Sequence, residues 1–105
     1  MPIPTHHSIK QLRRRAGMKK EQVPDIAQAA FSQGVSFHDA TGRLKQYLSK
    51  LYHSHGGTAS QIRTYNGFVY IFNKGILFTS YPIPGHLNKL AKQLQKKKAE
   101  GGSNE

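Results

Sequence analysis

The sequence predicts an α+β domain in which helices pack on one face of a three-stranded antiparallel β-meander, followed by a short C-terminal helix. Two observations lead to this fold class. Apolar residues recur at helical spacing through the first half of the 105-residue chain, and short strand-like runs separated by turns follow in the second half. We expect residues 1–95 to form a single basic domain and residues 96–105 to form a disordered basic, glycine-rich tail.

The first half of the chain predicts three helices. The first lies between a Thr5 or Ser8 cap and Gly17, the second runs from about Glu21 to Gln33, and the third from about Thr41 to His53. The apolar positions that set the helical period are Ile9, Leu12 and Ala16, then Val23, Ile26, Ala27, Ala30 and Phe31, then Leu44, Tyr47, Leu48 and Leu51. Gly56-Gly57 is expected to end the third helix.

The second half predicts the meander, with strands at Gln61–Tyr65, Phe68–Phe72 and Ile76–Tyr81. Asn66-Gly67 is a strong signal for a two-residue hairpin turn between the first two of these strands. Prolines close the third strand, and a final helix is expected over about His86–Lys98. The alternation of the strand residues leaves open which face of the sheet the helices cover.

Charge is the strongest compositional signal. Sixteen Lys and Arg residues stand against five Asp and Glu residues, which gives a formal net charge of +11. Such a field attracts polyanions, so the partner favoured by composition is a nucleic acid, RNA or DNA. A membrane surface would need a basic helix with a strong apolar face, which the lysine-rich C-terminal helix lacks. An acidic protein partner, or charge that serves solubility alone, stays open.

Several chemistries lack their residues. The chain has no cysteine, which excludes a disulfide framework, a thiolate zinc site and a cysteine nucleophile. Glu21, Asp25 and Asp39 are too scattered for paired-carboxylate or two-metal hydrolysis. We therefore expect no metal and no cofactor. The first residues contain no apolar run typical of a signal peptide, so we expect a soluble, cytoplasmic protein.

One chemistry fits what remains. RNA can be cleaved by its own 2′-hydroxyl when a protein supplies a proton acceptor, a proton donor and cations for the transition state. Six histidines and the Arg13-Arg14-Arg15 patch could supply these groups, although single histidines and helical arginines are often only solvated surface. The expected phosphate contacts are Lys10, Arg13, Arg14, Arg43 and Arg63. Strand aromatics such as Tyr65 and Phe68 could stack bases or fill the core.

A series of short motifs runs from about Thr5 to Leu87. They are His7 followed by Arg15-Ala16-Gly17-Met18, then residues 26–35, Thr41-Gly42-Arg43-Leu44, Leu51-Tyr52, residues 62–65, residues 69–72 and residues 77–84. In this order they resemble a group of small uncharacterised bacterial and mobile-element proteins. That group is similar to the barnase–EndoU–colicin–RelE class of metal-independent ribonucleases, which includes toxins of toxin–antitoxin systems.

The resemblance implies a basic groove for RNA and a site bordered by His7, Arg15, Thr79 and Tyr81. His7 would act as general acid or base, Arg15 with Arg14 would hold the scissile phosphate, and Tyr81 or Thr79 would assist. An acidic antitoxin is an implied partner. The chain departs from the related helix at one position, Gln11, where a further basic residue is often found.

Three hypotheses follow from the residues and the resemblance together. The protein is a RelE-like endoribonuclease, a non-catalytic nucleic-acid-binding regulator, or an interaction protein whose basic face docks an acidic partner. The first requires His7, Arg15 and the end of the last strand to converge on one concave basic face.

Overall fold

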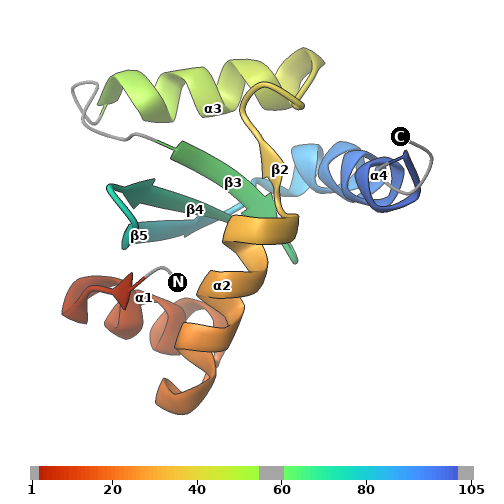
Figure 1. Ribbon diagram of the computed structural model, residues 1–105. Helices are drawn as coiled ribbons and strands as arrows, with labels where there is room; N and C mark the ends of the chain where they lie inside the picture. Colours follow the sequence, from red (N-terminus) through yellow and green to blue (C-terminus); the bar gives the residue numbers. More distant parts are fainter. Residues whose placement is uncertain (1–2, 55–60, 102–105) are drawn as a thin grey trace.

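The computed structural model describes residues 3–54 and 61–101, and in these ranges the strands form one mixed sheet (Figure 1). The strands are β1 (Ile3–Pro4), β2 (Val35–Ser36), β3 (Gln61–Tyr65), β4 (Phe68–Asn73) and β5 (Ile76–Pro82), in the spatial order β1-β5-β4-β3-β2. The pair β1–β5 is parallel and the other pairs are antiparallel. The expected meander is therefore the centre of a wider, five-stranded sheet. The added strands have two residues each, too few to show an alternating pattern in the sequence.

The helices are α1 (His6–Ala16), a short 3₁₀ turn η1 (Lys20–Gln22), α2 (Val23–Gln33), α3 (Gly42–Ser54) and α4 (Gly85–Gly101). Helix α1 has the expected signals at both ends. The Thr5 side chain accepts a hydrogen bond from the backbone N–H of Ser8, and Gly17 ends the helix with a left-handed φ of 64°. Pro24 lies in the first turn of α2, where its missing N–H costs no helical hydrogen bond.

The β3–β4 turn is confirmed as a two-residue hairpin. Asn66 and Gly67 have φ values of 49° and 83°, and such positive values at both central residues are typical of a type I′ turn. Lys74 and Gly75 repeat the pattern between β4 and β5, with φ values of 52° and 79°. These turns set the register of the three central strands.

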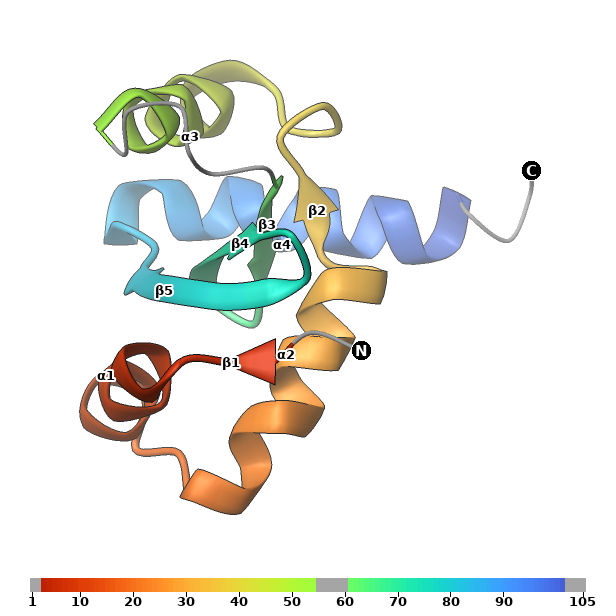
Figure 2. The same cartoon turned by 60° about the vertical axis from the view of Figure 1, so that its left-hand side comes forward.

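The expectation that helices cover one face of the sheet is wrong, because they cover both. Tyr70 and Phe72 of β4 pack with α1 and α2, while Val69 and Ile71 pack with α3 and α4. Figure 2 shows the first pair of helices on one side of the sheet and α3 on the other. The reason is that the central strand is apolar on both faces, with four consecutive buried residues, so each face needs a cover.

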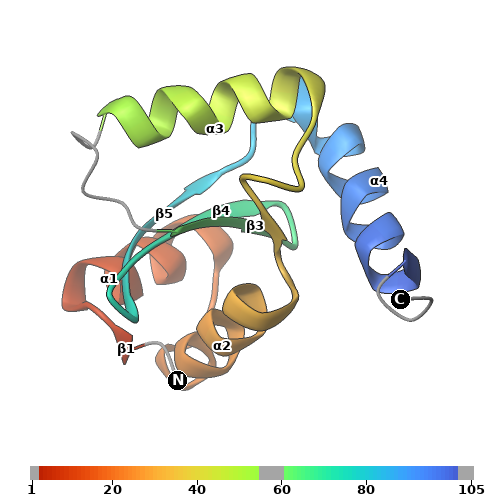
Figure 3. The ribbon, with the colours of Figure 1, turned by 45° about the horizontal axis from the view of Figure 1, so that its top comes forward.

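The last helix also differs from expectation. Helix α4 continues to Gly101, beyond the expected end at about Lys98, so the lysines at 96–98, which were also assigned to a disordered tail, lie in the helix (Figure 3). The Lys98 ammonium donates to the Gly34 carbonyl at 2.6 Å and lies 3.5 Å from the Asp39 carboxylate, which ties this end of α4 to the α2–β2 junction. Residues 102–105, His55 and Gly56-Gly57 lie outside the described residues. Within the described helices, none is long and apolar enough to cross a membrane.

Candidate nucleic-acid interface

Helix α1 lies along the outer edge of β5, where β1 has already ended. There, side chains of the α1 region take the place of a neighbouring strand. The Thr5 hydroxyl donates to the Phe78 carbonyl at 3.2 Å, Gln11 accepts from the Ser80 N–H at 3.0 Å, and Arg15 donates to the Ser80 carbonyl at 2.7 Å. An unpaired strand edge leaves backbone groups without partners, so these contacts fix where α1 sits.

Gln11 is the centre of this contact. Its side-chain oxygen accepts from the Thr79 hydroxyl at 2.5 Å as well as from the Ser80 N–H. Thr79 is only 2% exposed, and its hydroxyl is used to hold α1. The structure therefore gives Thr79 a positioning role. Gln11, where the resemblance would expect a basic residue, holds α1 on the sheet.

Arg15 reaches the end of the last strand, as the resemblance implies. Its guanidinium carbon lies 5.5 Å from the centre of the Tyr81 ring, while the same group donates to the Ser80 carbonyl. Tyr81 and Tyr47 of α3 pack against the same core cluster, on the face of the sheet that α3 and α4 cover. Burial raises the pKa of the Tyr47 phenol above its ordinary value, and the nearby Tyr81 adds to this rise.

His7 is exposed in the first turn of α1, on the same flank as Gln11 and Arg15. These residues are spaced at i, i+4 and i+8, so His7 and Arg15 lie about 12 Å apart along the helix axis. The structure thus brings Arg15 to Tyr81 but places His7 two turns away along the edge of β5. Of the residues that were required to converge, Arg15 and Tyr81 lie together, and His7 does not join them.

A basic groove lies on the outer side of α1, with a volume of about 870 Å³. We call it the α1 groove. Its walls are α1 and the segment that follows Gly17, and its cations are Lys10, Arg13, Arg14, Lys19 and Lys20. His6 also lines it, and Glu21 is its single carboxylate. Like charges gathered in a concave surface strengthen the local field that attracts an anion.

The sequence places these cations together for a simple reason. Lys10, Arg13 and Arg14 are spaced at i, i+3 and i+4, so they share one face of α1. The left-handed Gly17 then turns the chain back, which brings Lys19 and Lys20 to the same groove. Three predicted phosphate contacts are therefore brought together. The two lysines were missed, although a lysine pair two residues after a helix-ending glycine was a usable signal.

The other two predicted phosphate contacts lie elsewhere. Arg43 is exposed on α3, which covers the opposite face of the sheet from α1. Arg63 on β3 donates to the Phe31 carbonyl at 3.3 Å and to the Gln61 side chain at 2.6 Å, and its guanidinium lies 5.6 Å from the Phe31 ring. Burial lowers the pKa of Arg63 below its ordinary value. Neither arginine lines the α1 groove, and Arg63 serves the packing of α2.

The strand aromatics are mostly core. Tyr70 and Phe72 are buried, and Tyr65 and Phe68 pack against the same cluster, so these rings do not form an open stacking surface. Phe78, at a register irregularity in the β4–β5 ladder, is 48% exposed and lies beside α1. Over residues 3–54 and 61–101, no three His, Asp or Glu side chains gather as a metal site would require.

Comparison of the chain with protein-family profiles, with curated proteins and with solved structures finds no match. The case for a function therefore depends on the residues and on the geometry described above.

Proposed function

We propose that this protein binds RNA through the α1 groove. The observation that carries the proposal is the concentration of Lys10, Arg13, Arg14, Lys19 and Lys20 in one concave surface that holds a single carboxylate. Arginine binds phosphate with a planar, often bidentate fork, and lysine adds a mobile point charge. The sequence resemblance to RelE-like ribonucleases favours RNA over DNA, and an RNA partner agrees with the cytoplasmic location expected from the sequence.

The test is the salt dependence of RNA affinity, measured by fluorescence anisotropy with a labelled single-stranded RNA. Each phosphate contact contributes about −0.7 to the slope of log affinity against log salt, so the five cations of the α1 groove predict a slope of about −3.5. Arg13→Gln should weaken binding and reduce the steepness of the slope by about one contact. Lys50→Gln, which removes an exposed charge on α3, is the matched control and should leave the slope nearly unchanged.

Equal small losses in Arg13→Gln and Lys50→Gln would contradict a specific role for the α1 groove. Weak, variant-independent RNA binding would instead favour the third hypothesis, an interaction protein whose basic face docks an acidic partner. Recovery of that partner by co-purification would then replace the RNA proposal.

A second candidate function is metal-independent RNA cleavage at the α1–β5 edge. The observation in its favour is the exposed Arg15 over the Tyr81 ring, with His7 on the same flank of α1. In such a reaction the RNA 2′-oxygen attacks the adjacent phosphorus while a base takes the hydroxyl proton. His7 fills this role only if its side chain turns along α1 toward Arg15, because the two residues start two helical turns apart. The bond from phosphorus to the 5′-oxygen breaks, a proton donor such as Tyr81 protonates the leaving oxygen, and a cyclic phosphate remains. Arg15 would neutralise the charge that develops on the phosphoryl oxygens.

This second function is tested by incubating RNA with purified protein in EDTA. Cleavage should occur in the unmodified protein and be lost in His7→Ala, while RNA affinity stays within about twofold. His53→Ala on α3 is the control for loss of an exposed histidine. Cleavage that survives His7→Ala, or RNA binding with no cleavage at all, would leave binding as the whole function.

A further inference from the structure

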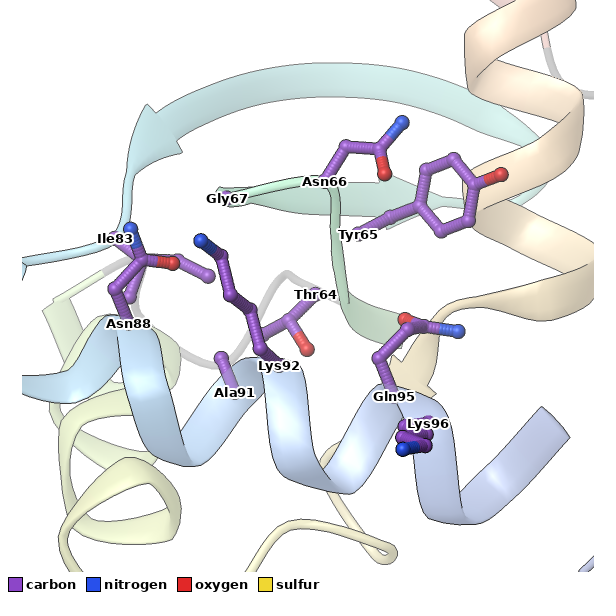
Figure 4. Close-up of a pocket in the computed structure, with 10 residues that line it drawn as sticks. All are labelled: Thr64, Tyr65, Asn66, Gly67, Ile83, Asn88, Ala91, Lys92, Gln95 and Lys96. Carbon is purple, nitrogen blue, oxygen red and sulfur yellow. The ribbon is translucent and has the colours of Figure 1, made fainter. Parts of the chain in front are cut away.

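A second cavity, of about 620 Å³, lies between the β3–β4 hairpin and α4 (Figure 4). We call it the hairpin pocket. Asn88, Lys92 and Gln95 line it from α4, where their i, i+4 and i+7 spacing places them on one helical face. Thr64 of β3 lines it from the sheet. Because α4 and α1 pack on opposite faces of the sheet, this pocket is separate from the α1 groove.

The hairpin pocket gathers polar atoms that have no partner. Among the described residues, four buried side-chain oxygens lack a hydrogen bond, and three of them line this pocket: Thr64 Oγ1, Asn88 Oδ1 and Gln95 Oε1. Thr64 is only 1% exposed, and Figure 4 shows its hydroxyl directed toward α4. Buried polar atoms in native proteins almost always have partners, so three such oxygens around one pocket supply hydrogen-bonding groups for a bound molecule.

The orientation of one of these groups is fixed by its own contacts. The Gln95 amide nitrogen donates to the Gln33 carbonyl at 2.8 Å, so the Gln95 oxygen is the atom left for the pocket. The Asn88 oxygen is a second acceptor, and the Thr64 hydroxyl can both donate and accept. A ligand that satisfies the set must therefore present N–H or O–H donors.

The rest of the lining narrows the ligand further. Lys92 and Lys96 give the pocket positive charge and so favour a ligand that also carries a negative group. Ile83 and Ala91 supply an apolar wall suited to the face of a ring. The volume lies within the range of about 300–1,000 Å³ that small-molecule sites occupy. A ring with an exposed amino group, joined to a phosphate, meets all of these demands.

We infer that the hairpin pocket binds one unpaired nucleotide whose base carries an exocyclic amino group: adenine, cytosine or guanine. The amino group donates to the Gln95 oxygen, and the Thr64 hydroxyl pairs with the neighbouring edge of the base. The Asn88 oxygen, about two helical turns from Gln95, accepts from a ribose hydroxyl, and the phosphate lies toward Lys92 and Lys96. The inference rests on the proposed RNA function and specifies its substrate as single-stranded, because base pairing would occupy the same amino group.

The experiment is an NMR titration of the isotope-labelled full chain with AMP, CMP and GMP, and with UMP and ribose 5-phosphate for comparison. Backbone amides of Thr64, Asn88 and Gln95 should shift with the first three nucleotides. Affinity for them should exceed that for ribose 5-phosphate by about tenfold, and UMP should bind several-fold more weakly than AMP.

Thr64→Val is the informative variant, because it keeps the shape of the side chain and removes the unpartnered hydroxyl. It should weaken AMP binding several-fold while leaving thermal stability equal or higher. Ser80→Ala is the matched control, since Ser80 Oγ is the fourth unpartnered buried oxygen and does not line the pocket. It should leave AMP binding unchanged. An equal loss of binding in both variants would contradict the assignment.

The outcome separates this inference from the function on which it rests. If no mononucleotide shifts these amides, the hairpin pocket inference is overturned. Salt-sensitive RNA binding that weakens in Arg13→Gln would still support the α1 groove in that case. If RNA does not bind at all, the proposed function fails, and the single-stranded RNA assignment of the pocket fails with it.

Discussion

Gln11 holds α1 on the sheet through one oxygen that accepts from both Thr79 and Ser80. Gln11→Leu leaves a buried hydroxyl and a strand-edge N–H without an acceptor. We expect it to lower the free energy of unfolding by about 2–4 kcal/mol, measured by urea denaturation. Gln11→Glu keeps an acceptor oxygen and should lose much less.

A surface glutamine provides the control for that measurement. Gln46 is exposed on α3, so Gln46→Leu should change the free energy of unfolding by no more than about 0.5 kcal/mol. If Gln11→Leu behaves like Gln46→Leu, the contact between Gln11 and β5 does not stabilise the fold as described.

Tyr70 makes stability depend on alkaline pH. Burial, with Tyr65 nearby, raises the pKa of the Tyr70 phenol from 10.0 to about 12. The neutral phenol is therefore favoured in the folded chain. The neutral phenol's contribution to the free energy of unfolding is fully present below about pH 10, the pKa of the tyrosine in the unfolded chain. It is lost as the pH rises from about 10 to 12, by about 2–3 kcal/mol in total. Lysine deprotonation also occurs in this range, so the comparison with Tyr70→Phe isolates the tyrosine.

The measurement is urea denaturation of both proteins between about pH 9 and pH 11.5. Unmodified protein should lose stability more steeply than Tyr70→Phe over this range. Parallel curves for the two proteins would show that Tyr70 ionises equally well in the folded and unfolded chains.

Single residues were the hardest feature to predict from sequence. Of the expected phosphate contacts, Lys10, Arg13 and Arg14 share one surface because helical spacing alone determines which residues share a face, whereas Arg43 and Arg63 lie elsewhere. Thr79 and Arg63 were expected at a site, yet their polar groups bind Gln11 and the Phe31 carbonyl. Those partners are distant in sequence, and no local pattern identifies them.

At the scale of elements, the junction between α2 and β2 depends on the absence of a side chain at Gly34. Its φ of −67° suits any residue, so the constraint is one of space. A Cβ there would meet the Ala30 carbonyl oxygen, with the Arg63 Cβ and the Thr64 carbonyl oxygen both at 3.0 Å. Gly34→Ala should therefore cost about 2–3 kcal/mol in a urea denaturation experiment.

Gly85, at the start of α4, is the matched control. A Cβ at this position would meet no atom within 4 Å, so Gly85→Ala should be neutral or stabilise the protein by up to about 1 kcal/mol. Similar losses in the two variants would show that the effect arises from chain flexibility and not from the packing of Gly34.

Elements with strong local signals were predictable. The cap at Thr5, the stop at Gly17 and the Asn66-Gly67 turn are all confirmed, because each depends on the conformational preference of a few adjacent residues. Strands β1 and β2 were missed because they form only through pairing with distant strands. The expectation that helices cover only one face of the sheet was wrong. It assumed that β4 has one buried and one exposed face, whereas both of its faces are buried.

At the scale of the whole molecule, the net charge of +11 should oppose folding. The described residues contain one ion pair, Lys98–Asp39, in which the side chains are 35% and 54% exposed, so few attractions offset this repulsion. Raising sodium chloride from low to moderate concentration should therefore increase stability, by an amount on the order of 1 kcal/mol. Thermal denaturation measures this change, and a melting temperature that falls with salt would contradict it.

The most direct test of the central claim is a map of backbone amide shifts on adding a short single-stranded RNA at low salt. The account predicts that shifts concentrate at Lys10, Arg13, Arg14, Lys19 and Lys20, that they diminish with added salt, and that Arg43 on α3 is little affected. Shifts centred on α3, or spread evenly over every lysine and arginine of the surface, would contradict the α1 groove as the RNA-binding site.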